Sequence, residues 1–333
     1  MKILVTGSTG GIGQWVVSRL LEAGHTVRAI DITAQPLSSD YEYLPGDIRD
    51  IHLIRSAVQG MEAVVHLAAI PYDGDRQDEQ VLDVNIRGTY TILLASQEAG
   101  VRRVVNFSSI NAIGQAEPTH PGLYLPLDDD TPHHNVRNYS LSKHVGEAMC
   151  SAFSRRGVFS AVSLRPTLVT HPGPAKQHWW NFMPEEAKIR FATKDFWSYV
   201  DVRDVAEAAL LSLTAPVEHH QAFLLSAADN RYHTPTAEIV EKYFAHLPWP
   251  KISREAYLAR GEYVSLLNCD SAKEGWAGSR AGASLIPLPG TCHDQPTRQN
   301  YHTYRRVRWV GGLHCQRPGN PRHSPGPGWL SRK

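Results

Sequence analysis

The sequence lacks the features that mark secreted, membrane-spanning or nucleic-acid-binding proteins. Its 333 residues include four cysteines, Cys150, Cys269, Cys292 and Cys315, which are widely separated and form no CxxC pair. This spacing argues against a disulfide framework and indicates reduced thiols inside a cell. No apolar run approaches the roughly 20 residues that a membrane span needs. With 34 basic and 33 acidic residues the net charge is +1, so nothing global favours nucleic acid or an anionic membrane surface.

The amino terminus and the histidines also lack familiar signals. The opening stretch, MKILVTGSTGG, reaches its glycines too early for a signal peptide, so a cytoplasmic protein that binds neither membrane nor nucleic acid is expected. The adjacent histidine pairs that begin at residues 133 and 219 lie beside proline or loop-like sequence. Because they lack the spacing of metal ligands, no metal site is predicted.

The balanced charge conceals a composition break near residue 270. Residues 271–333 contain ten Lys or Arg against two acids, with seven Pro and nine Gly, so this segment carries +8 and the first 270 residues carry −7. Stretches such as RPGNPRHSPGPGW hold neither a helix nor a strand ladder. One interpretation is that the segment is a basic interaction tail. The other is that it is not the segment with which the rest of the chain evolved, as would follow from a shifted reading frame. Either way we expect a poorly ordered extension without catalytic work.

Strand-like and helix-like segments alternate through the first half of the chain. Short apolar runs are followed by segments with apolar residues at helical spacing, one of them over about residues 79–99. The runs are KILVTG, TVRAID, EAVVHLAA, RRVVNFSS and FSAVSLRP. Strands of this kind belong to a parallel sheet covered on both faces. The sequence therefore predicts an α/β fold, with a Rossmann-type doubly wound parallel sheet in residues 1–165, a return to it at 199–226, and a smaller substrate-binding region within 166–270.

The first predicted turn, TGSTGGIG, has the residues of a dinucleotide-binding loop. Gly7, Gly10 and Gly13 fall where a strand becomes a helix, and they let the backbone approach a pyrophosphate at the helix N-terminus. The spacing is GxxGxxG, and glycines alone would also suit an ordinary turn. Asp31 ends the second strand, where a carboxylate accepts the adenosine ribose hydroxyls and repels a 2'-phosphate. The two signals together predict NAD rather than NADP as the cofactor.

A further signal is YSLSK, in which Tyr139 and Lys143 share one face of a predicted helix. A phenol has a pKa of about 10 and is a poor base at neutral pH, but a nearby ammonium favours the phenolate and lowers that pKa. Tyr139 would then take the proton of a substrate hydroxyl as hydride passes to NAD. Lys143 would hold the nicotinamide ribose, and Ser109 would orient the substrate oxygen. A YxxxK pattern alone is more often a pair of exposed residues on a helix. Here a nucleotide-binding pattern precedes it, and this favours a catalytic role over the exposed pair.

Several more motifs occur in order within residues 1–270, namely GDIRD, HLAA, FSSINAIG and WSYVDVRDVAEA. With TGSTGGIG and YSLSK they resemble the extended short-chain dehydrogenase/reductases of the NAD-dependent epimerase/dehydratase family. The resemblance implies a catalytic set of Ser109, Tyr139 and Lys143, and a homodimer formed through the helices near 80–99 and 139–156. The further cofactor contacts that it implies are Gly11, Ile12, Asp47, Ile48, Leu67, Ala68, Ala69 and Asn85. Of these, Asp47 and Ile48 would border the adenine, and Leu67 and Ala68 the nicotinamide side.

Departures from the family's pattern bear on the reaction. Dehydratase members resemble one another in an Asp-Glu pair just after the active-site serine or threonine, where this chain has Ile110 and Asn111. Members that bind nucleotide diphosphates usually have a long insertion, whereas only about thirty residues separate Arg165 from the strand in WSYVDV. These residues include the acids Glu185 and Glu186, although Lys176, Lys188 and Arg190 keep a diphosphate site possible. The segment SSINAIG is somewhat similar to its counterpart in uronate dehydrogenases.

We therefore expect an NAD-dependent oxidoreductase that transfers hydride between NAD and a hydroxyl-bearing carbon of a small sugar or sugar acid. One alternative is a sugar-nucleotide epimerase, which would oxidise and re-reduce the same carbon and keep its NAD. Another is a catalytically silent NAD-binding sensor. The complete set of Ser109, Tyr139 and Lys143 argues against the sensor.

Overall fold

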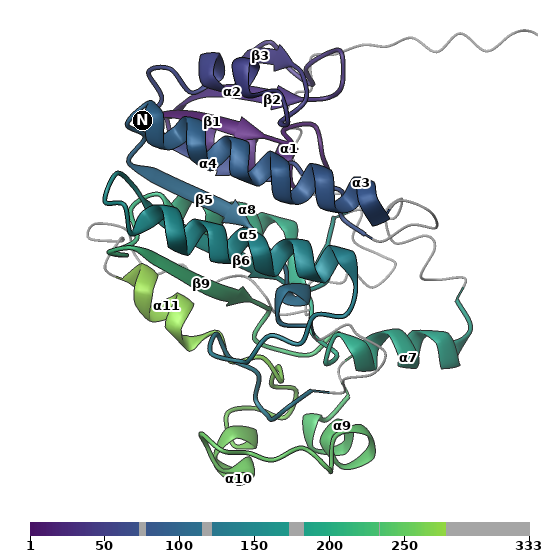
Figure 1. The fold of residues 1–333 in the computed structure, drawn as a ribbon. Helices are drawn as coiled ribbons and strands as arrows, with labels where there is room; N and C mark the ends of the chain where they lie inside the picture. The colour runs from purple at the N-terminus through teal and green to yellow at the C-terminus, as the bar shows by residue number, and fades with distance from the viewer. Residues whose placement is uncertain (73–77, 115–121, 173–182, 233, 278–333) are drawn as a thin grey trace, which may run out of the picture. The chain divides into compact units, whose positions relative to one another are not determined.

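A seven-stranded sheet forms the centre of the part of the chain that the computed structural model describes, residues 1–72, 78–114, 122–172, 183–232 and 234–277. The strand order is β3-β2-β1-β4-β5-β6-β9, and every neighbouring pair is parallel (Figure 1). The strands are β1 (Lys2–Thr6), β2 (Thr26–Asp31), β3 (Glu42–Pro45), β4 (Ala63–His66), β5 (Arg103–Phe107), β6 (Ser160–Pro166) and β9 (His220–Leu225). The chain order reverses between β1 and β4, so the predicted doubly wound Rossmann-type sheet is confirmed.

The inner strands are apolar because both of their faces are covered. All four residues of β4 are buried, as are the last four of β1 and β5. Successive side chains of a strand point to opposite faces of the sheet, and here they are buried on both faces. This is the pattern of a parallel sheet between helical layers. Burial of this continuous apolar surface is the main driving force for the sheet.

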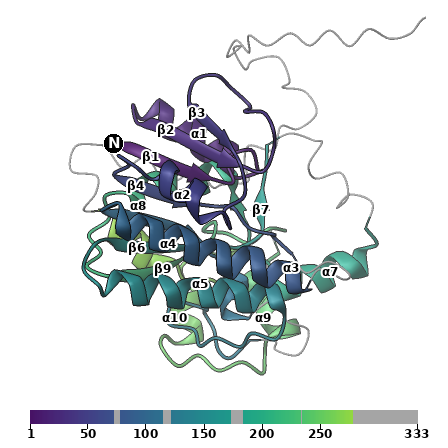
Figure 2. The same cartoon turned by 45° about the horizontal axis from the view of Figure 1, so that its top comes forward.

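Helices cover both faces of the sheet. One core cluster joins the sheet to α1 (Gly13–Glu22) and α8 (Val202–Ser212), through residues such as Val16, Leu20 and Val205. A second cluster joins the other face to α2 (Ile51–Ala57), α4 (Gly88–Glu98) and α5 (Asn138–Ser154), which lie on one side in both ribbon views (Figures 1 and 2). Before α4 the chain runs through a short helix, α3 (Asp78–Leu82), and a π-helical turn, η1 (Asp83–Arg87).

A third core cluster belongs to a smaller region. It contains buried aromatic and aliphatic side chains such as Phe196, Trp197 and Phe244, and Phe196 stacks on Phe244 with 4.8 Å between ring centroids. The helices of this region are α7 (Glu185–Lys194), α9 (Thr236–Tyr243) and α10 (Arg254–Leu258), and a short parallel pair consists of β7 (Val169–Thr170) and β8 (Val200–Asp201). Asp201 accepts a hydrogen bond from the amide of Arg203 and so caps α8.

The helix α11 (Asp270–Ala277) crosses the boundary that composition places at residue 270. Ala272 and Trp276 are buried in the core of the main sheet, and the Trp276 ring lies 5.7 Å from that of Phe223 in β9. The start of the expected tail is therefore part of the folded body. The rest of it, residues 278–333, lies outside the described residues.

Within the described ranges, no helix is long and apolar enough to cross a membrane. The same ranges contain no group of three or more His, Cys, Asp or Glu side chains that could hold a metal ion.

Candidate functional site

The glycine-rich turn between β1 and α1 is built so that no side chain fits at two of its positions. Gly7 has φ of 71°, and a Cβ atom there would lie 2.6 Å from the amide nitrogen of Ala68. A Cβ atom on Gly13 would lie 2.0 Å from the carbonyl oxygen of Gly7. The turn therefore lies directly against the loop after β4, and only glycine permits this approach.

The amino end of α1 is open for an anion. Its N-cap residue, Ile12, offers no side-chain cap, and no acid lies in the first turn. The amides of Gln14 and Trp15 donate to the carbonyls of Gly10 and Ile12. The helix dipole makes this end electropositive, which favours a pyrophosphate at the turn of Gly10 and Gly11.

Asp31 lies at the carboxyl end of β2, next to the glycine-rich turn. Its carboxylate accepts hydrogen bonds from the amides of Thr9, at 2.9 Å, and Ile32, at 2.7 Å. The first of these bonds ties the strand end to the turn. Because a carboxylate has about four acceptor positions, capacity remains for ribose hydroxyls.

The loop after β4 contains Leu67, Ala68 and Ala69, and a buried polar chain fixes its start. Thr89 donates to the carbonyl of Asn85 at 2.6 Å, so its oxygen accepts from Nε2 of His66 at 3.0 Å. Nδ1 of His66 then accepts from the hydroxyl of Thr6 at 2.8 Å. This network assigns the Nε2-H tautomer, and burial lowers the pKa of His66 to about 3. His66 is a neutral structural residue.

Asn85 also orders this loop. Its side-chain oxygen accepts from the amide of Ile70 at 2.8 Å, and its nitrogen donates to the carbonyl of Ile70 and the hydroxyl of Ser142, both at 3.0 Å. The side chain thus links the loop after β4 to α5, and it is 3% exposed as a residue. Asn85 therefore positions this loop, and its contact with the cofactor stays a prediction.

Asp47 and Ile48 follow β3 and differ in their surroundings. Asp47 forms a bidentate ion pair with Arg49, at 2.6 to 3.0 Å, and Arg49 also binds Asp83 in η1 at 2.5 Å. The Arg49 guanidinium lowers the pKa of Asp47 below its usual range. Ile48 is buried against Gly88, where a Cβ atom would lie 2.2 Å from its Cδ1. Its side chain therefore belongs to the core, and its backbone is the part that remains for a cofactor contact.

Ser109 occupies the corner between β5 and the 3₁₀ turn η2 (Ile110–Ile113). It is the N-cap of that turn, and its hydroxyl oxygen accepts from the amide of Asn111 at 3.1 Å. This bond fixes the position of the oxygen and leaves the hydroxyl proton to donate elsewhere. The turn packs against α5, the helix that begins one residue before Tyr139.

Lys143 connects the same corner to α5. Its Nζ donates to the carbonyl of Phe107 at 2.7 Å and lies 5.7 Å from the ring centroid of Tyr139. Burial lowers the pKa of Lys143 to about 8, while the charge of Glu147 opposes that shift. The structure thus brings together the two helix residues and the end of the strand that leads to Ser109, in an arrangement suited to proton transfer.

Sequence reasoning missed the groups beneath this corner. Glu147 and Arg165 form a buried ion pair, and Ser108 donates to Glu147 at 2.5 Å. The available signal was the position of Glu147, which follows Lys143 by one helical turn and is therefore on the same face of α5.

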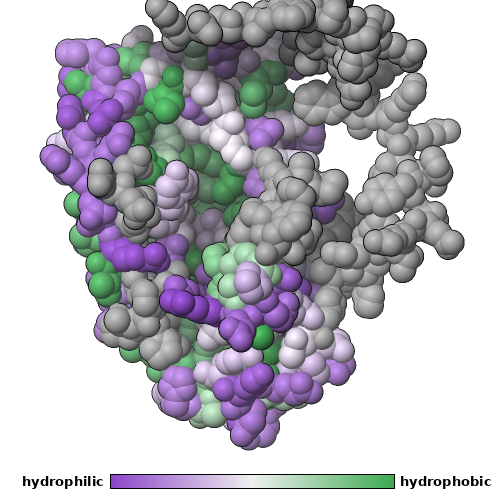
Figure 3. All heavy atoms as spheres, turned by 90° about the vertical axis from the view of Figure 1, so that its right-hand side faces the viewer, coloured by the Kyte–Doolittle hydropathy of each residue, from purple (hydrophilic) through white to green (hydrophobic). Residues whose placement is uncertain are grey.

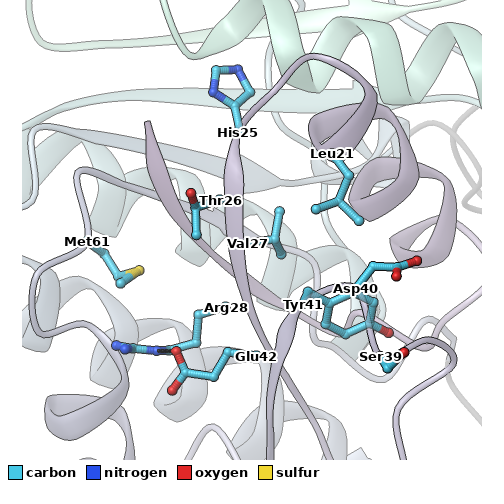
Figure 4. Close-up of a pocket in the computed structure, with 10 residues that line it drawn as sticks. All are labelled: Leu21, His25, Thr26, Val27, Arg28, Ser39, Asp40, Tyr41, Glu42 and Met61. Carbon is cyan, nitrogen blue, oxygen red and sulfur yellow. Dashed lines mark hydrogen bonds and ion pairs between the residues drawn. The ribbon is translucent and has the colours of Figure 1, made fainter.

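A surface hollow of about 510 Å³ lies at the other end of the sheet. Figure 4 shows its lining, in which Arg28 and Glu42 face one another and form an ion pair at 2.7 Å. Its strand residues begin at Thr26, the first residue of β2, whereas Asp31 is the last. Ligands of doubly wound sheets bind at the carboxyl ends of the strands, so this hollow is separate from the candidate site. Figure 3 shows the side at the right of Figure 1, where hydrophobic residues (green) are exposed beside hydrophilic ones (purple).

The fold and the site define a nucleotide-dependent oxidoreductase of the Rossmann type. The sequence profile of the NAD dependent epimerase/dehydratase family matches residues 3–225, about two thirds of the chain, and the protein belongs to this family. It is an extended short-chain dehydrogenase/reductase, and its cofactor is NAD.

Individual proteins of several activities are similar to this chain. Sterol demethylase protein B of Methylococcus capsulatus is 31% identical over 234 residues, 64% of this chain and 66% of that protein, which is just under two thirds of its length. Cinnamoyl-CoA reductase 1 of Arabidopsis thaliana is 28% identical over 269 residues, 74% of this chain and 76% of that protein. A UDP-glucose 4-epimerase of Thermotoga maritima has the same fold, with a TM-score of 0.61 and 21% identity, over 83% of this chain and 93% of that one.

The residues present fit NAD. The turn of Gly7 and Gly13 leaves space that a Cβ atom would fill, α1 starts without a side-chain cap, and Asp31 places a carboxylate beside the turn. Lys143 has two further N–H donors beyond its bond to Phe107, which suits it to hold ribose hydroxyls.

Proposed function

We propose that the protein is an NAD-dependent dehydrogenase that acts on a hydroxyl-bearing carbon of a small sugar or sugar acid. The observation that carries this proposal is the hydrogen bond from Lys143 to Phe107. It joins the helix of Tyr139 to the strand that ends beside Ser109, so that three groups with complementary roles share one corner of the site.

Each residue has a defined role in this proposal. Tyr139 accepts the proton of the substrate hydroxyl in the oxidation direction and returns it in the reverse direction. The ammonium of Lys143 favours the phenolate of Tyr139 through its charge. Ser109 donates its free hydroxyl proton to the substrate oxygen and holds it near Tyr139. NAD, when bound, accepts or supplies the hydride.

Two features support dehydrogenation over other reactions of the family. Ile110 is buried and apolar, and it and Asn111 occupy the places of the acid pair that the elimination of water requires, so that chemistry lacks its proton carriers. Lys188 in α7 is paired with Glu185 at 3.3 Å, which reduces its availability for a diphosphate. A nucleotide diphosphate needs several Arg, Lys or backbone donors, so these features favour a free sugar or uronate.

The similarity to cinnamoyl-CoA reductase supports a second candidate, the reduction of an aromatic aldehyde or thioester by NADH. The same three residues would serve it, because a carbonyl that accepts hydride from NADH takes its proton from Tyr139. With an aldehyde this gives the alcohol, and with a thioester it gives a hemithioacetal that then releases the thiol and leaves the aldehyde. The fold likeness to a UDP-glucose 4-epimerase keeps epimerisation as a third.

A substrate screen with purified protein tests the proposal. NAD is supplied with free sugars, uronates and nucleotide sugars, and NADH is supplied with aromatic aldehydes and thioesters, while reduced cofactor is followed. We expect NADH to accumulate in proportion to a free sugar or uronate, with no inhibition by UDP. Consumption of NADH only with aromatic carbonyls would support the second candidate, and tight UDP binding with isomerised sugar and no net NADH would support the epimerase.

We also propose a homodimer through α4 and α5. Tyr90 and Leu141 on these helices are 47% and 40% exposed. The two helices pack against each other, and exposed apolar side chains are typical of such interfaces. Sedimentation velocity should show a dimer that Leu141→Glu dissociates and that Val158→Glu, at a 39% exposed position outside both helices, leaves intact. A monomeric unsubstituted protein would contradict the proposal.

A further inference from the structure

A buried ion pair lies directly below the corner of Ser109 and Lys143. Arg165, in β6, donates from Nε to Oε1 of Glu147 at 2.9 Å and from Nη2 to Oε2 at 2.7 Å. The two side chains are 4% and 5% exposed. Replacement of such a pair by apolar residues of similar volume is often neutral or stabilising, so its presence is weak evidence for a stability role.

The pair is part of a longer network that ends at the active-site strand. Ser108 donates to Oε1 of Glu147 at 2.5 Å. Arg165 donates from Nη1 to the carbonyl of Asp129 at 2.8 Å, and the Asp129 carboxylate accepts from the amide of Leu224 at 2.6 Å and from Ser271. The Glu147 carboxylate thus accepts three hydrogen bonds from two residues, Ser108 and Arg165, and these bonds fix its position.

We propose that Glu147 is a positioning residue for the catalytic corner, acting on Ser109 through Ser108 and on Lys143 through its charge. This inference rests on the proposed function, since it assigns Glu147 to the site of Ser109, Tyr139 and Lys143. Glu147 touches neither substrate nor cofactor in this role.

The first effect concerns the geometry of the corner. Ser108 precedes Ser109, and its amide donates to the carbonyl of Asn106 at 3.2 Å. The additional bond to Glu147 restrains the Ser108 side chain, so the next residue enters η2 with a single backbone direction. The hydroxyl oxygen of Ser109 then caps η2 by accepting from the amide of Asn111, which keeps this oxygen in place.

The second effect concerns the charge on Lys143. Glu147 follows Lys143 by four residues on α5, and although burial alone would raise the pKa of Glu147, the Arg165 guanidinium holds it below its usual value. The anion raises the pKa of Lys143, against burial, which lowers it. Loss of the anion would therefore leave Lys143 less protonated at neutral pH, and Tyr139 would lose the cation that favours its phenolate.

Other titratable groups also face Glu147. They come from α5, from β6, from β9 and from the loop before α5, and they are Lys143, His144, Cys150, Arg165, His220 and His133. Glu147 is the carboxylic acid among these groups. Its neutralisation should therefore lower the pKa of Lys143.

Titration of Lys143 tests the second effect without any substrate. Isotope-labelled lysine is followed by NMR in the NAD-free full chain, and the Lys143 signal is assigned by its absence in Lys143→Met. Glu147→Gln keeps the size of the side chain and removes its charge, and we expect it to lower the pKa of Lys143 by about one unit. A matched control is Glu207→Gln, which removes a carboxylate in α8 that pairs with Arg19, and it should leave the Lys143 signal unchanged. An unchanged pKa in folded Glu147→Gln would overturn this effect.

Ser108→Ala tests the first effect and retains the ion pair, so it also serves if Glu147→Gln does not fold. Hydrogen exchange of the amides of Asn111 and Ala112, which bond to Ser109, should accelerate about tenfold. The control is Ser212→Ala, which removes a buried hydroxyl bonded within α8 and should not alter that exchange. Equal exchange in both variants would overturn the proposal.

Activity separates this inference from the proposed function. If the screen finds a substrate, Glu147→Gln should move the alkaline limb of the kcat profile to lower pH, whereas a merely structural residue would lower the melting temperature and leave the profile in place. If no substrate is found, the proposed function fails, while the titration and exchange results still decide the role of Glu147.

Discussion

Tyr139 and Lys143 lie one helical turn apart on α5, and the bond from Lys143 to Phe107 fixes their helix to β5. The Lys143 side chain is only partly accessible, so its ammonium is poorly solvated. Burial therefore disfavours the charged form and lowers the pKa of Lys143 to about 8. The same weak solvation strengthens its effect on Tyr139. At the scale of single residues, the proposed chemistry therefore depends on an ammonium whose pKa lies close to neutral pH.

Replacement of Tyr139 by phenylalanine tests the proton carrier. The ring packing is retained and the hydroxyl is removed, so kcat should fall by about 10² to 10⁴-fold while NAD affinity stays near that of the unsubstituted protein. Steady-state kinetics and a fluorescence titration with NAD measure the two quantities. Tyr90→Phe, which alters an exposed tyrosine on α4, is the control. Near-normal turnover in Tyr139→Phe would exclude the proposed role.

Asp31→Asn tests the choice of cofactor. Asparagine keeps an acceptor for the amide of Thr9 or Ile32 but removes the charge that repels a 2'-phosphate. The ratio of kcat/KM for NAD to that for NADP should fall about tenfold or more. Asp50→Asn, at the N-cap of α2, is a matched control. Equal use of both cofactors by the unsubstituted protein would count against the role of Asp31.

Site residues could be predicted from the sequence where a local backbone turn requires them. The contacts between residues that are distant in the sequence could not be predicted. Gly7 and Gly13 follow from the turn alone, and the structure shows why a Cβ atom is excluded. The bonds of Asn85 to Ile70 and Ser142 join segments 15 and 57 residues away, so no local pattern shows them. Glu147 and Arg165 meet for the same reason, across α5 and β6.

At the scale of elements, the five apolar runs correspond to β1, β2, β4, β5 and β6, because strands buried on both faces have a clear signal. The edge strand β3 was not predicted, since its residues are half-buried or exposed and show no apolar run. The predicted helix over 79–99 is divided into α3, the π-helical turn and α4, and apolar spacing does not report such a change of hydrogen bonding. The strand β9 lies within residues 199–226, for which a return to the sheet was predicted but no separate strand was named.

His66 connects three elements, β1, β4 and α4, and makes their packing sensitive to pH. Its pKa is about 3 in the folded protein against an ordinary value of 6.5. The unfolded chain therefore binds the extra proton between these values, so stability is greatest above pH 6.5 and falls as the pH drops toward 3. At pH 5 this group alone should cost about 2 kcal/mol of unfolding free energy.

Urea unfolding at pH 7 and pH 5 measures this dependence. His66→Gln removes the titrating ring, so the difference between the two pH values should shrink by about 2 kcal/mol relative to the unsubstituted protein. His219→Gln, at a largely exposed side chain, should not change it. The same pH difference in all three proteins would show that His66 is charged or exposed in the folded state.

At the scale of the whole molecule, composition alone placed the end of the folded body a few residues too early. The break in charge and in Pro and Gly content begins near residue 270, yet α11 contributes Ala272 and Trp276 to the core beside β9. The seven residues of α11 that lie within 271–333 are too few to alter a composition count taken over 63 residues. The contact between Trp276 and Phe223 shows that α11 belongs to the folded body. These residues are more than 50 positions apart, so no local stretch of sequence reveals the contact.

Two truncations separate the helix from the segment that follows it. A chain that ends at Ala277 keeps Trp276 and should bind NAD like the full chain, because every predicted cofactor residue lies upstream. A chain that ends at Asp270 also loses the burial of Trp276 and the bond from Ser271 to Asp129, so its unfolding free energy should fall by about 3 kcal/mol or more. Urea unfolding and NAD titration compare both with the full chain, and Trp276→Ala in the full chain should reproduce most of the loss. Equal stability of the chains ending at Asp270 and at Ala277 would show that α11 does not belong to the folded body. If the chain ending at Ala277 stayed folded but did not bind NAD, residues 278–333 would have a role in cofactor binding.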